Sequence, residues 1–326
     1  MIGRVAAVTD PGRRRRRNED SYVVEPPLFA IADGMGGAQA GEIASRLATV
    51  ALKESGADAG GEQRIVDLIG EANRRVYDRS STDPNTSGMG TTITVALVEN
   101  ERVAFGHVGD SRAYLIRDSR MEQLTEDHSL VNELLKSGRL SLEEAESHPQ
   151  RSVITRALGT DPDVDVDTFT IAAGDGDLFL LCSDGLTDML AEDSILDVVE
   201  RNRGDIEGAL RALVSAANKA GGEDNITVVA FEIAAEGELD DTREQALPSK
   251  PAAVDEERTL TEADGVPAVD TMVVPVEQIQ TDAAREDEAH DRKVRRRHLR
   301  RRLVAWLVLL LIVAAVLFAL YLRFVR

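Results

Sequence analysis

The chain has 326 residues, with 38 Lys and Arg against 58 Asp and Glu, which gives a formal charge of −20. Its length and its 43% of apolar residues suit one large or two ordinary domains with a substantial core, and they exclude a collagen or a wholly disordered chain. The single cysteine, Cys182, excludes an intrachain disulfide and is compatible with a reducing compartment. Nucleic acid is not an expected partner, because nucleic-acid-binding proteins present net positive surfaces.

Residues 1–235 carry 41 acidic and 24 basic side chains, net −17, and short apolar runs alternate with glycine-led turns, as in a folded domain. Apolar or β-branched runs predict strands, and apolar residues at helical spacing predict helices. In chain order these are a strand at 28–32, helices around 43–51 and 65–76, strands at 91–99, 103–108, 113–116 and 177–182, helices at 194–201 and 206–219, and a strand at 226–231. Because helices and strands come in separate runs, we expect a largely antiparallel α+β domain.

The rest of the chain changes character twice. Residues 236–291 carry 17 acidic and 4 basic side chains, net −13, with four prolines, which predicts a solvated, disordered linker. Residues 292–326 carry ten basic and no acidic side chains. Within them a basic segment, 292–302, precedes twenty uninterrupted apolar residues, 303–322, a length that predicts a transmembrane helix.

The distribution of arginine and lysine around this span predicts its orientation. Residues 292–302 hold eight of the ten basic side chains, and residues 323–326 hold two. The positive-inside rule therefore places the folded domain in the cytoplasm and residues 323–326 in a short extracytoplasmic tail. We expect a single-pass protein of the cell membrane that contacts lipid through its C-terminal helix.

Three aspartates stand beside predicted strands. Asp33 follows LFAIA, Asp184 follows LFLLCS, and Asp224 precedes the last strand in EDNIT. One such aspartate is most often a turn residue or a helix cap, but three in this setting suggest metal ligands. Oxygen donors without nearby cysteine or paired histidine suit Mg²⁺ or Mn²⁺ rather than zinc. The chain has no HExxH, CxxC or GxxxxGK[ST] motif, so zincin, redox and P-loop functions lack support.

Five consecutive arginines, Arg13 to Arg17, precede Glu19 and Asp20. Four of them are interpreted as a solvated basic loop. Arg15 is the exception, because an arginine beside an acidic metal site can bind two phosphate oxygens at once, which lysine does less well. Asp110, in VGDSR at a strand connection, is a further candidate oxygen ligand.

Taken in order, RxxNED, DGMGG, GTT, VGDSRAY, LTEDHSLV, ITRALG, CSDGL and EDNIT resemble the protein phosphatase 2C family of metal-dependent phosphatases across nearly all of residues 1–235. The resemblance implies two antiparallel β-sheets packed face to face as a sandwich with helices outside. It also implies a dinuclear metal cleft at one end of that sandwich and phosphoserine or phosphothreonine substrates.

Carried over residue by residue, the resemblance implies that Asp33 bridges two metal ions, with the Gly34 carbonyl on one of them. Asp184 and Asp224 match ligands of the second ion. The expected cofactors are two Mn²⁺ or Mg²⁺ ions per active site, with Asp110 at the position that helps to bind a weaker third ion in bacterial relatives.

Three further positions match the motif around the ions. Glu19 and Asp20 match the acidic pair that holds metal-bound water from the other side, and Arg15 aligns with the arginine that binds substrate phosphate. Two cations that share a water would lower its pKa and orient it toward phosphorus, so no phosphoenzyme is needed. Cys182 is therefore interpreted as a small apolar strand residue and not as a nucleophile.

The chain departs from the family pattern at the proton donor. Many eukaryotic relatives have a histidine two residues after the first metal aspartate, where this chain has Met35. His128 and His148 are interpreted as structural or surface residues, so the general acid is left unassigned. Residues 137–160 correspond to the mobile flap of bacterial members and are expected to form a loop with one short helix.

The resemblance is closest to actinobacterial membrane phosphatases that reverse transmembrane Ser/Thr kinases. Phosphorylated proteins, such kinases among them, are therefore the expected partners. Two other functions stay open at this point: an inactive, phosphatase-like binding module, and a hydrolase of nucleotides or small phosphoesters. The first would normally have lost metal carboxylates, whereas Asp33, Asp184 and Asp224 are all present. The second would need a closed specificity pocket.

Overall fold

The computed structural model describes residues 1–36, 40–54, 60–146 and 148–234. The predicted linker, basic segment, transmembrane helix and tail, residues 236–326, lie outside these residues. Within the described part of the chain, no helix has both the length and the apolar character needed to cross a membrane.

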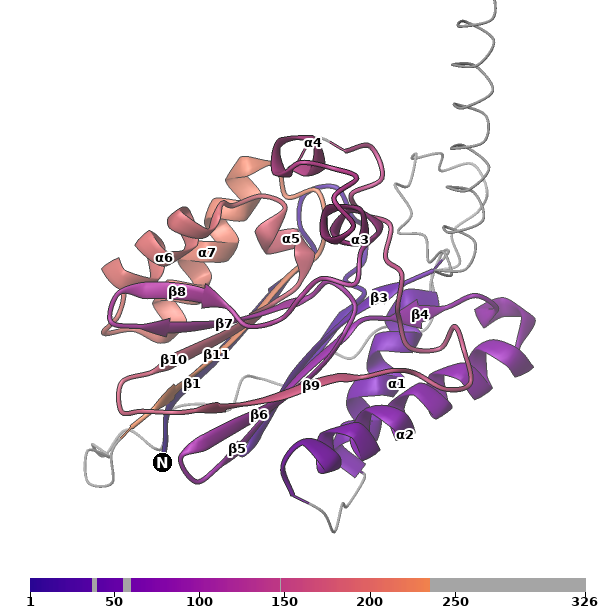
Figure 1. The fold of residues 1–326 in the computed structure, drawn as a ribbon, viewed down its shortest axis with the longest axis horizontal. Helices are drawn as coiled ribbons and strands as arrows, with labels where there is room; N and C mark the ends of the chain where they lie inside the picture. The colour runs from indigo at the N-terminus through magenta and orange to yellow at the C-terminus, as the bar shows by residue number, and fades with distance from the viewer. Residues whose placement is uncertain (37–39, 55–59, 147, 235–326) are drawn as a thin grey trace, which may run out of the picture. The chain divides into compact units, whose positions relative to one another are not determined.

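Two antiparallel sheets form the centre of the described domain (Figure 1). The first sheet has the order β1-β11-β10-β7-β8, and the second has the order β2-β3-β5-β6-β9, with the short β4 paired to β3. The strands are β1 (Ile2–Asp10), β2 (Asp20–Glu25), β3 (Leu28–Met35), β4 (Gly90–Thr91), β5 (Ile93–Glu99), β6 (Arg102–Val108), β7 (Arg112–Arg117), β8 (Arg120–Gln123), β9 (Asp167–Ala172), β10 (Leu178–Cys182) and β11 (Ile226–Ile233).

Successive side chains of a buried strand point to opposite faces of its sheet. Because both sets are apolar, both faces of each sheet must be covered. In β10, Phe179 and Leu181 belong to the apolar cluster between the sheets, where Phe179 stacks on Phe231 at 5.2 Å. The alternate residues Leu178, Leu180 and Cys182 belong to a cluster that includes helix residues. Because every residue of β10 is buried, this strand reads as a continuous apolar run.

Helices supply that cover on the outer faces. The helices α1 (Ala40–Glu54) and α2 (Gly61–Thr82) pack on the second sheet, and α6 (Glu192–Arg201) and α7 (Ile206–Ala220) pack on the first, as Figure 1 shows. The shorter elements are α3 (Leu130–Lys136), α4 (Leu142–Glu146), α5 (Asp184–Thr187) and the 3₁₀ turn η1 (Pro84–Thr86). The α+β class and the two flanked antiparallel sheets agree with the prediction.

The predicted strand at 91–99 is wrong in one detail, because it divides at Thr92 into β4 and β5. The Thr92 amide donates to the Asp33 carbonyl at 2.8 Å, and Thr91 pairs with Leu158. Both strands pair with β3, β4 at Gly34 and Met35 and β5 between Leu28 and Ile31. Four strands, β1, β2, β8 and β9, fall outside the predicted ranges, because all four lie at sheet edges and their apolar alternation is weak.

Candidate metal centre

All the candidate ligands lie where strands begin or end on the same side of the two sheets. Asp33 stands near the end of β3, Asp20 begins β2, and Asp110 lies in the turn between β6 and β7. Asp184 follows β10, and Asp224 precedes β11. Because neighbouring strands are antiparallel, the end of one lies beside the start of the next, so residues far apart in the sequence meet at this edge.

Asp20 and Asp33 face each other across the β2–β3 pair. The Ser183 hydroxyl donates to Asp20 Oδ2 at 2.9 Å, which ties β2 of the second sheet to the residue after β10 of the first. Behind Asp33, its carbonyl accepts a hydrogen bond from Thr91 Oγ1 at 2.7 Å, and its amide donates to Thr92 Oγ1 at 3.1 Å. These bonds hold the side chain of Asp20 and the backbone of Asp33.

Asp224 is held by the arginine that the sequence singled out. The Arg15 guanidinium donates to Asp224 Oδ2 at 2.7 Å, and both side chains are about 30% exposed. The amide of Asn225 donates to Asp224 Oδ1 at 2.8 Å. Asn225 Oδ1 also accepts the Glu19 amide at 2.8 Å, so Asn225 joins the chain segments that carry Glu19 and Asp224.

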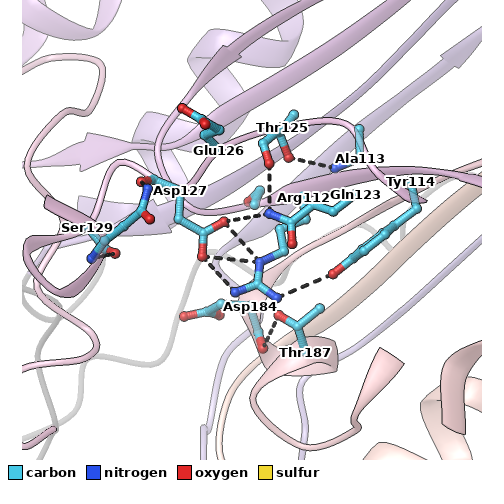
Figure 2. Close-up of polar contacts among 12 residues, drawn as sticks. Arg112, Ala113, Tyr114, Gln123, Thr125, Glu126, Asp127, Ser129, Asp184 and Thr187 are labelled. Carbon is cyan, nitrogen blue, oxygen red and sulfur yellow. Dashed lines mark hydrogen bonds and ion pairs between the residues drawn. The ribbon is translucent and has the colours of Figure 1, made fainter. Parts of the chain in front are cut away.

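A second group of charges surrounds Asp110 and Asp184. Figure 2 shows Arg112 held between Asp127 and Tyr114, beside Asp184. Arg112 Nη2 donates to Asp127 Oδ2 at 2.7 Å, and Arg112 Nη1 donates to the Tyr114 hydroxyl at 3.3 Å. Burial, then the charges of Asp127 and Asp188, raises the pKa of Asp110, and the fixed guanidinium of Arg112 offsets only part of this rise.

The pKa values of these carboxyl groups reflect their burial and the charges of their neighbours. Burial, then repulsion from Asp20, Asp184, Asp224 and Asp110, raises the pKa of Asp33 well above its usual value. Burial, then Asp110 and Asp224, does the same to the pKa of Asp184. Burial also raises the pKa of Asp20 to about 6, of Asp110 to about 7 and of Glu19 to about 7. Asp33 therefore lies close enough to the other four predicted aspartates to be affected by their charges.

These side chains fit hard divalent cations by their chemistry. Asp20 Oδ1 and Asp184 Oδ1 are shielded from solvent and have no hydrogen-bond partner, which is costly for a carboxylate unless a cation compensates it. The donor set is oxygen only. Within the described residues, however, no three His, Cys, Asp or Glu side chains are arranged around one point as an assembled ion site. The carboxylates thus surround a shared region, and their individual ligand roles remain predictions.

Glu19 and Gly34 meet at the start of α1. The Gly34 amide donates to the Glu19 carbonyl at 3.2 Å, and the Ser45 hydroxyl of α1 donates to the same carbonyl at 2.5 Å. The Glu19 carboxylate lies toward α1, since a Cβ on Gly41 would come within 2.3 Å of Glu19 Oε2. Two glycines therefore allow the helix to approach the strands at the metal centre.

We expect Gly34→Ala to lower the free energy of unfolding by about 1–3 kcal/mol, because overpacking displaces backbone. A Cβ at Gly34 would lie 2.1 Å from the Gly41 carbonyl oxygen and 2.6 Å from that of Glu19. Urea titration measures the change. Gly70→Ala in α2 is the matched control, because nothing lies within 4 Å of its Cβ position, and it should stabilise by about 0.5–1 kcal/mol. Equal effects of the two substitutions would contradict the packing argument.

The described histidines make hydrogen bonds that suit structural roles. His107 is buried, accepts or donates at Thr94 Oγ1 (2.9 Å), and burial lowers its pKa to about 3. His128 Nδ1 accepts the Gly109 amide at 3.0 Å, so its Nε2 carries the proton and donates to Asp167 Oδ2 at 3.1 Å. His148 Nδ1 accepts the amide of Gln150. These contacts agree with the structural interpretation of His128 and His148.

Met35, at the position of the eukaryotic histidine, packs with Ile154 and Ala157 at the base of the predicted flap. Residues 137–160 contain the short helix α4, as predicted, whereas α3 before them was not predicted. The pair Arg151–Asp188, with nitrogen and oxygen 3.4 Å apart, joins this segment to the end of α5. Sequence reasoning also missed Asp188, Asp127 and Ser183, which have no motif of their own and are recognised only by their neighbours.

We expect Cys182 to resist alkylation in the folded protein. Its side chain is fully buried, and burial raises the pKa of the thiol to about 12, so almost no thiolate exists at neutral pH. Mass spectrometry after iodoacetamide treatment should find Cys182 unmodified in native protein and modified in urea. Rapid labelling of the native chain would contradict its interpretation as an inert core residue.

Comparison with known proteins assigns the family. The protein phosphatase 2C family matches residues 14–225. The serine/threonine phosphatase Stp of Listeria welshimeri is 42% identical over 236 residues, which cover 69% of this chain and 93% of that protein. The chain therefore belongs to the protein phosphatase 2C family and is an enzyme of that family.

Relatives from actinobacteria show the same likeness. The serine/threonine protein phosphatase PstP of Mycobacterium tuberculosis is 39% identical over 236 residues, 72% of this chain and 45% of that protein. A crystal structure of that phosphatase matches with a TM-score of 0.68 at 37% identity, covering 72% of this chain and all of the other. A second one, the PstP catalytic domain in complex with two manganese ions, has a TM-score of 0.66 at 34% identity and covers 72% and 99%.

Proposed function

We propose that this chain hydrolyses phosphoserine and phosphothreonine in proteins, with two Mn²⁺ or Mg²⁺ ions and a weaker third. The observation that carries the proposal is the ion pair of Arg15 with Asp224 at 2.7 Å, at the edge where Asp20, Asp33 and Asp184 gather. Relatives about 40% identical are named serine/threonine phosphatases, and one related structure holds two manganese ions.

The roles of the chain's own groups follow from their chemistry. Asp33, the Gly34 carbonyl, Asp184 and Asp224 would hold two cations, with Asp20 and Glu19 on the facing side and Asp110 at the third position. Bound divalent cations neutralise phosphate charge and make water a better nucleophile. Arg15 would donate two N–H groups to phosphate oxygens, and its bond to Asp224 aims the guanidinium at that place.

Ser183 and Asn225 are positioning residues in this proposal. Ser183 holds Asp20 by its hydroxyl, and Asn225 ties together the loops that carry Glu19 and Asp224. The relative placement of the two halves of the site therefore depends on hydrogen bonds from Ser183 and Asn225, and the bond to the Asp20 carboxylate is stronger when that group is ionised.

The test is release of phosphate from a phosphothreonine peptide in the presence of Mn²⁺, compared with nucleotides and with p-nitrophenyl phosphate. We expect turnover of the peptide that stops on chelation and returns with Mn²⁺. Turnover of nucleotides alone would favour a small-molecule hydrolase, and binding of the phosphopeptide without turnover would favour an inactive module.

We further propose that the chain acts at the cytoplasmic face of the cell membrane and reverses transmembrane Ser/Thr kinases. The twenty apolar residues 303–322 and the basic residues 292–302 support this location. Carbonate extraction should leave the chain in the membrane fraction, and a chain with two arginines introduced into 303–322 should be released. Loss of the phosphatase should raise phosphorylation of the kinase's activation segment.

A further inference from the structure

The loop between β1 and β2, residues 11–18, is called the arginine loop here, and its backbone is firmly held. The amides of Arg13 and Arg14 donate to the Gly222 carbonyl at 2.7 and 3.2 Å. Asn225 Nδ2 donates to the carbonyls of Pro11 and Arg17 at 3.0 and 2.8 Å. The loop is therefore fixed against the segment that carries Asp224.

Gly12 makes this close approach possible. Its φ is +77°, and a Cβ there would lie 2.1 Å from the Asp224 carbonyl oxygen. The arginines that follow cannot move freely away from the metal centre, because Gly12 packs on Asp224 and the amides of Arg13 and Arg14 are bonded to Gly222. Their position beside the site is a property of the fold.

The side chains of the loop divide into two sets. Arg15 and Arg17 are partly buried and reach the carboxylates of Asp224 and Glu42, at 2.7 and 3.8 Å. Arg13, Arg14 and Arg16 are exposed. The Arg14 contact with Glu223 is 3.4 Å long between side chains 69% and 50% exposed, a pairing that water screens strongly.

This concentration of positive charge contrasts with the rest of the domain. Residues 1–235 have a net charge of −17, yet five of their 24 basic side chains are consecutive in this loop. Like charges side by side repel each other, and nothing in helix or sheet packing requires them. The loop would therefore offer an anion a favourable approach to a centre that is otherwise acidic.

We propose that the exposed arginines of the loop bind aspartate and glutamate side chains flanking the phosphorylated residue of a protein substrate. The proposal rests on the phosphatase function and deepens it, because it names acidic phosphoproteins as the preferred substrates. Guanidinium groups bind carboxylates with two parallel hydrogen bonds, and Arg15 next to them fixes where the phosphate lies. Substrate recognition thus extends from Arg15 along Arg14 and Arg13.

The test compares two phosphothreonine peptides that differ only in their flanks, Asp and Glu in one and Asn and Gln in the other. For the full chain with Mn²⁺ we expect kcat/KM about fivefold to tenfold higher for the acidic peptide, mostly through KM. In the double variant Arg13→Gln, Arg14→Gln the preference should fall below about twofold, and it should also fall in wild type at high salt. Turnover of p-nitrophenyl phosphate should not change.

The matched control is Arg201→Gln, Arg211→Gln, which removes the same charge from exposed positions on α6 and α7. It should keep the preference of wild type. An equal loss in both double variants would assign the effect to net charge and overturn the proposal. Equal kcat/KM for the two peptides in wild type would also overturn it.

The arginine loop could instead bind an acidic segment of the same chain or anionic lipid, and each alternative predicts a different result for the Arg13, Arg14 variant. Higher turnover of the neutral peptide in the Arg13, Arg14 variant would mean that an acidic segment of the chain itself covers the loop. Weaker sedimentation of that variant with anionic vesicles, with the peptide preference unchanged, would mean that the loop faces lipid. Either result would overturn the proposal.

Binding separates failure of this proposal from failure of the phosphatase function. Fluorescent versions of the two peptides, with a non-hydrolysable phosphonate in place of the phosphate, are titrated with the full chain and followed by anisotropy. Tighter binding of the acidic peptide to wild type, lost in the Arg13, Arg14 variant, supports the proposal even if neither phosphopeptide is hydrolysed. Equal binding refutes it even if both are hydrolysed.

Discussion

Replacing Asp184 with asparagine is expected to lower kcat/KM for a phosphothreonine peptide on the order of a thousandfold, as loss of a charge-stabilising group in an active site does. The same change should raise the melting temperature of the chain in chelator by a few degrees. Asp184 Oδ1 is shielded from solvent without a hydrogen-bond partner, and Asp110, Asp224 and Asp188 repel its charge. The neutral amide removes that repulsion, and it also removes the negative charge that would hold a cation.

The two readouts distinguish a ligand from a structural residue. Asp163→Asn, the same chemical change at an exposed position, should alter neither activity nor melting temperature. With Mn²⁺ added, wild type should gain more thermal stability than the Asp184 variant, because ligand binding to the folded state stabilises it. If the variant is active or melts lower than wild type in chelator, Asp184 is not part of a repulsive cation site.

The fold could be predicted where periodicity is strong. The alternation that makes β10 a core strand and the helical spacing of Ile65, Leu68 and Ile69 are local, and both elements were found. The edge strand β8 was missed because its sequence, RMEQ, is partly exposed and has no apolar face to mark it. The resemblance implied two antiparallel sheets but not which strands pair, and nothing local states that β1 pairs with β11, more than 200 residues away.

The residues of the candidate site also differ in whether a local sequence signal marks them. Asp33, Asp184 and Asp224 were recognisable because each adjoins a strand and a turn residue. Asp188 and Asp127 were not, because their relevance depends on lying near Asp110 and Arg112 across chain segments. The exposed arginines are an intermediate case: the run is obvious in the sequence, but only the bonds to Gly222 place it beside Asp224. Long-range geometry therefore carries the information that composition and motif lack.

In chelator, the chain should become less stable as the pH rises from about 6.5 to 8, with a fall in melting temperature of about 5 °C. Burial raises the pKa of Glu19 and Asp110 to about 7 and the pKa values of Asp33 and Asp184 well above their usual range. The folded state therefore binds more protons than the unfolded chain, whose carboxyls have pKa values near 4. Stability declines until the pH passes the folded pKa values, and then it levels off.

The buried histidines act with the opposite sign, and this fixes the window. The lowered pKa values of His107 and His128 destabilise the fold as the pH falls below about 6.5, where the unfolded histidines take up protons. At pH 6.5 the unfolded histidines are half protonated, and their effect fades over about the next pH unit, so the larger number of carboxyl groups with raised pKa values outweighs it. Thermal melts in EDTA at pH 6.5, 7.25 and 8 should show the decline, and Asp184→Asn should flatten it. A melting temperature that rises across this range in EDTA would show that the carboxylates are not crowded together, because separated carboxylates with ordinary pKa values are fully ionised throughout and add no slope.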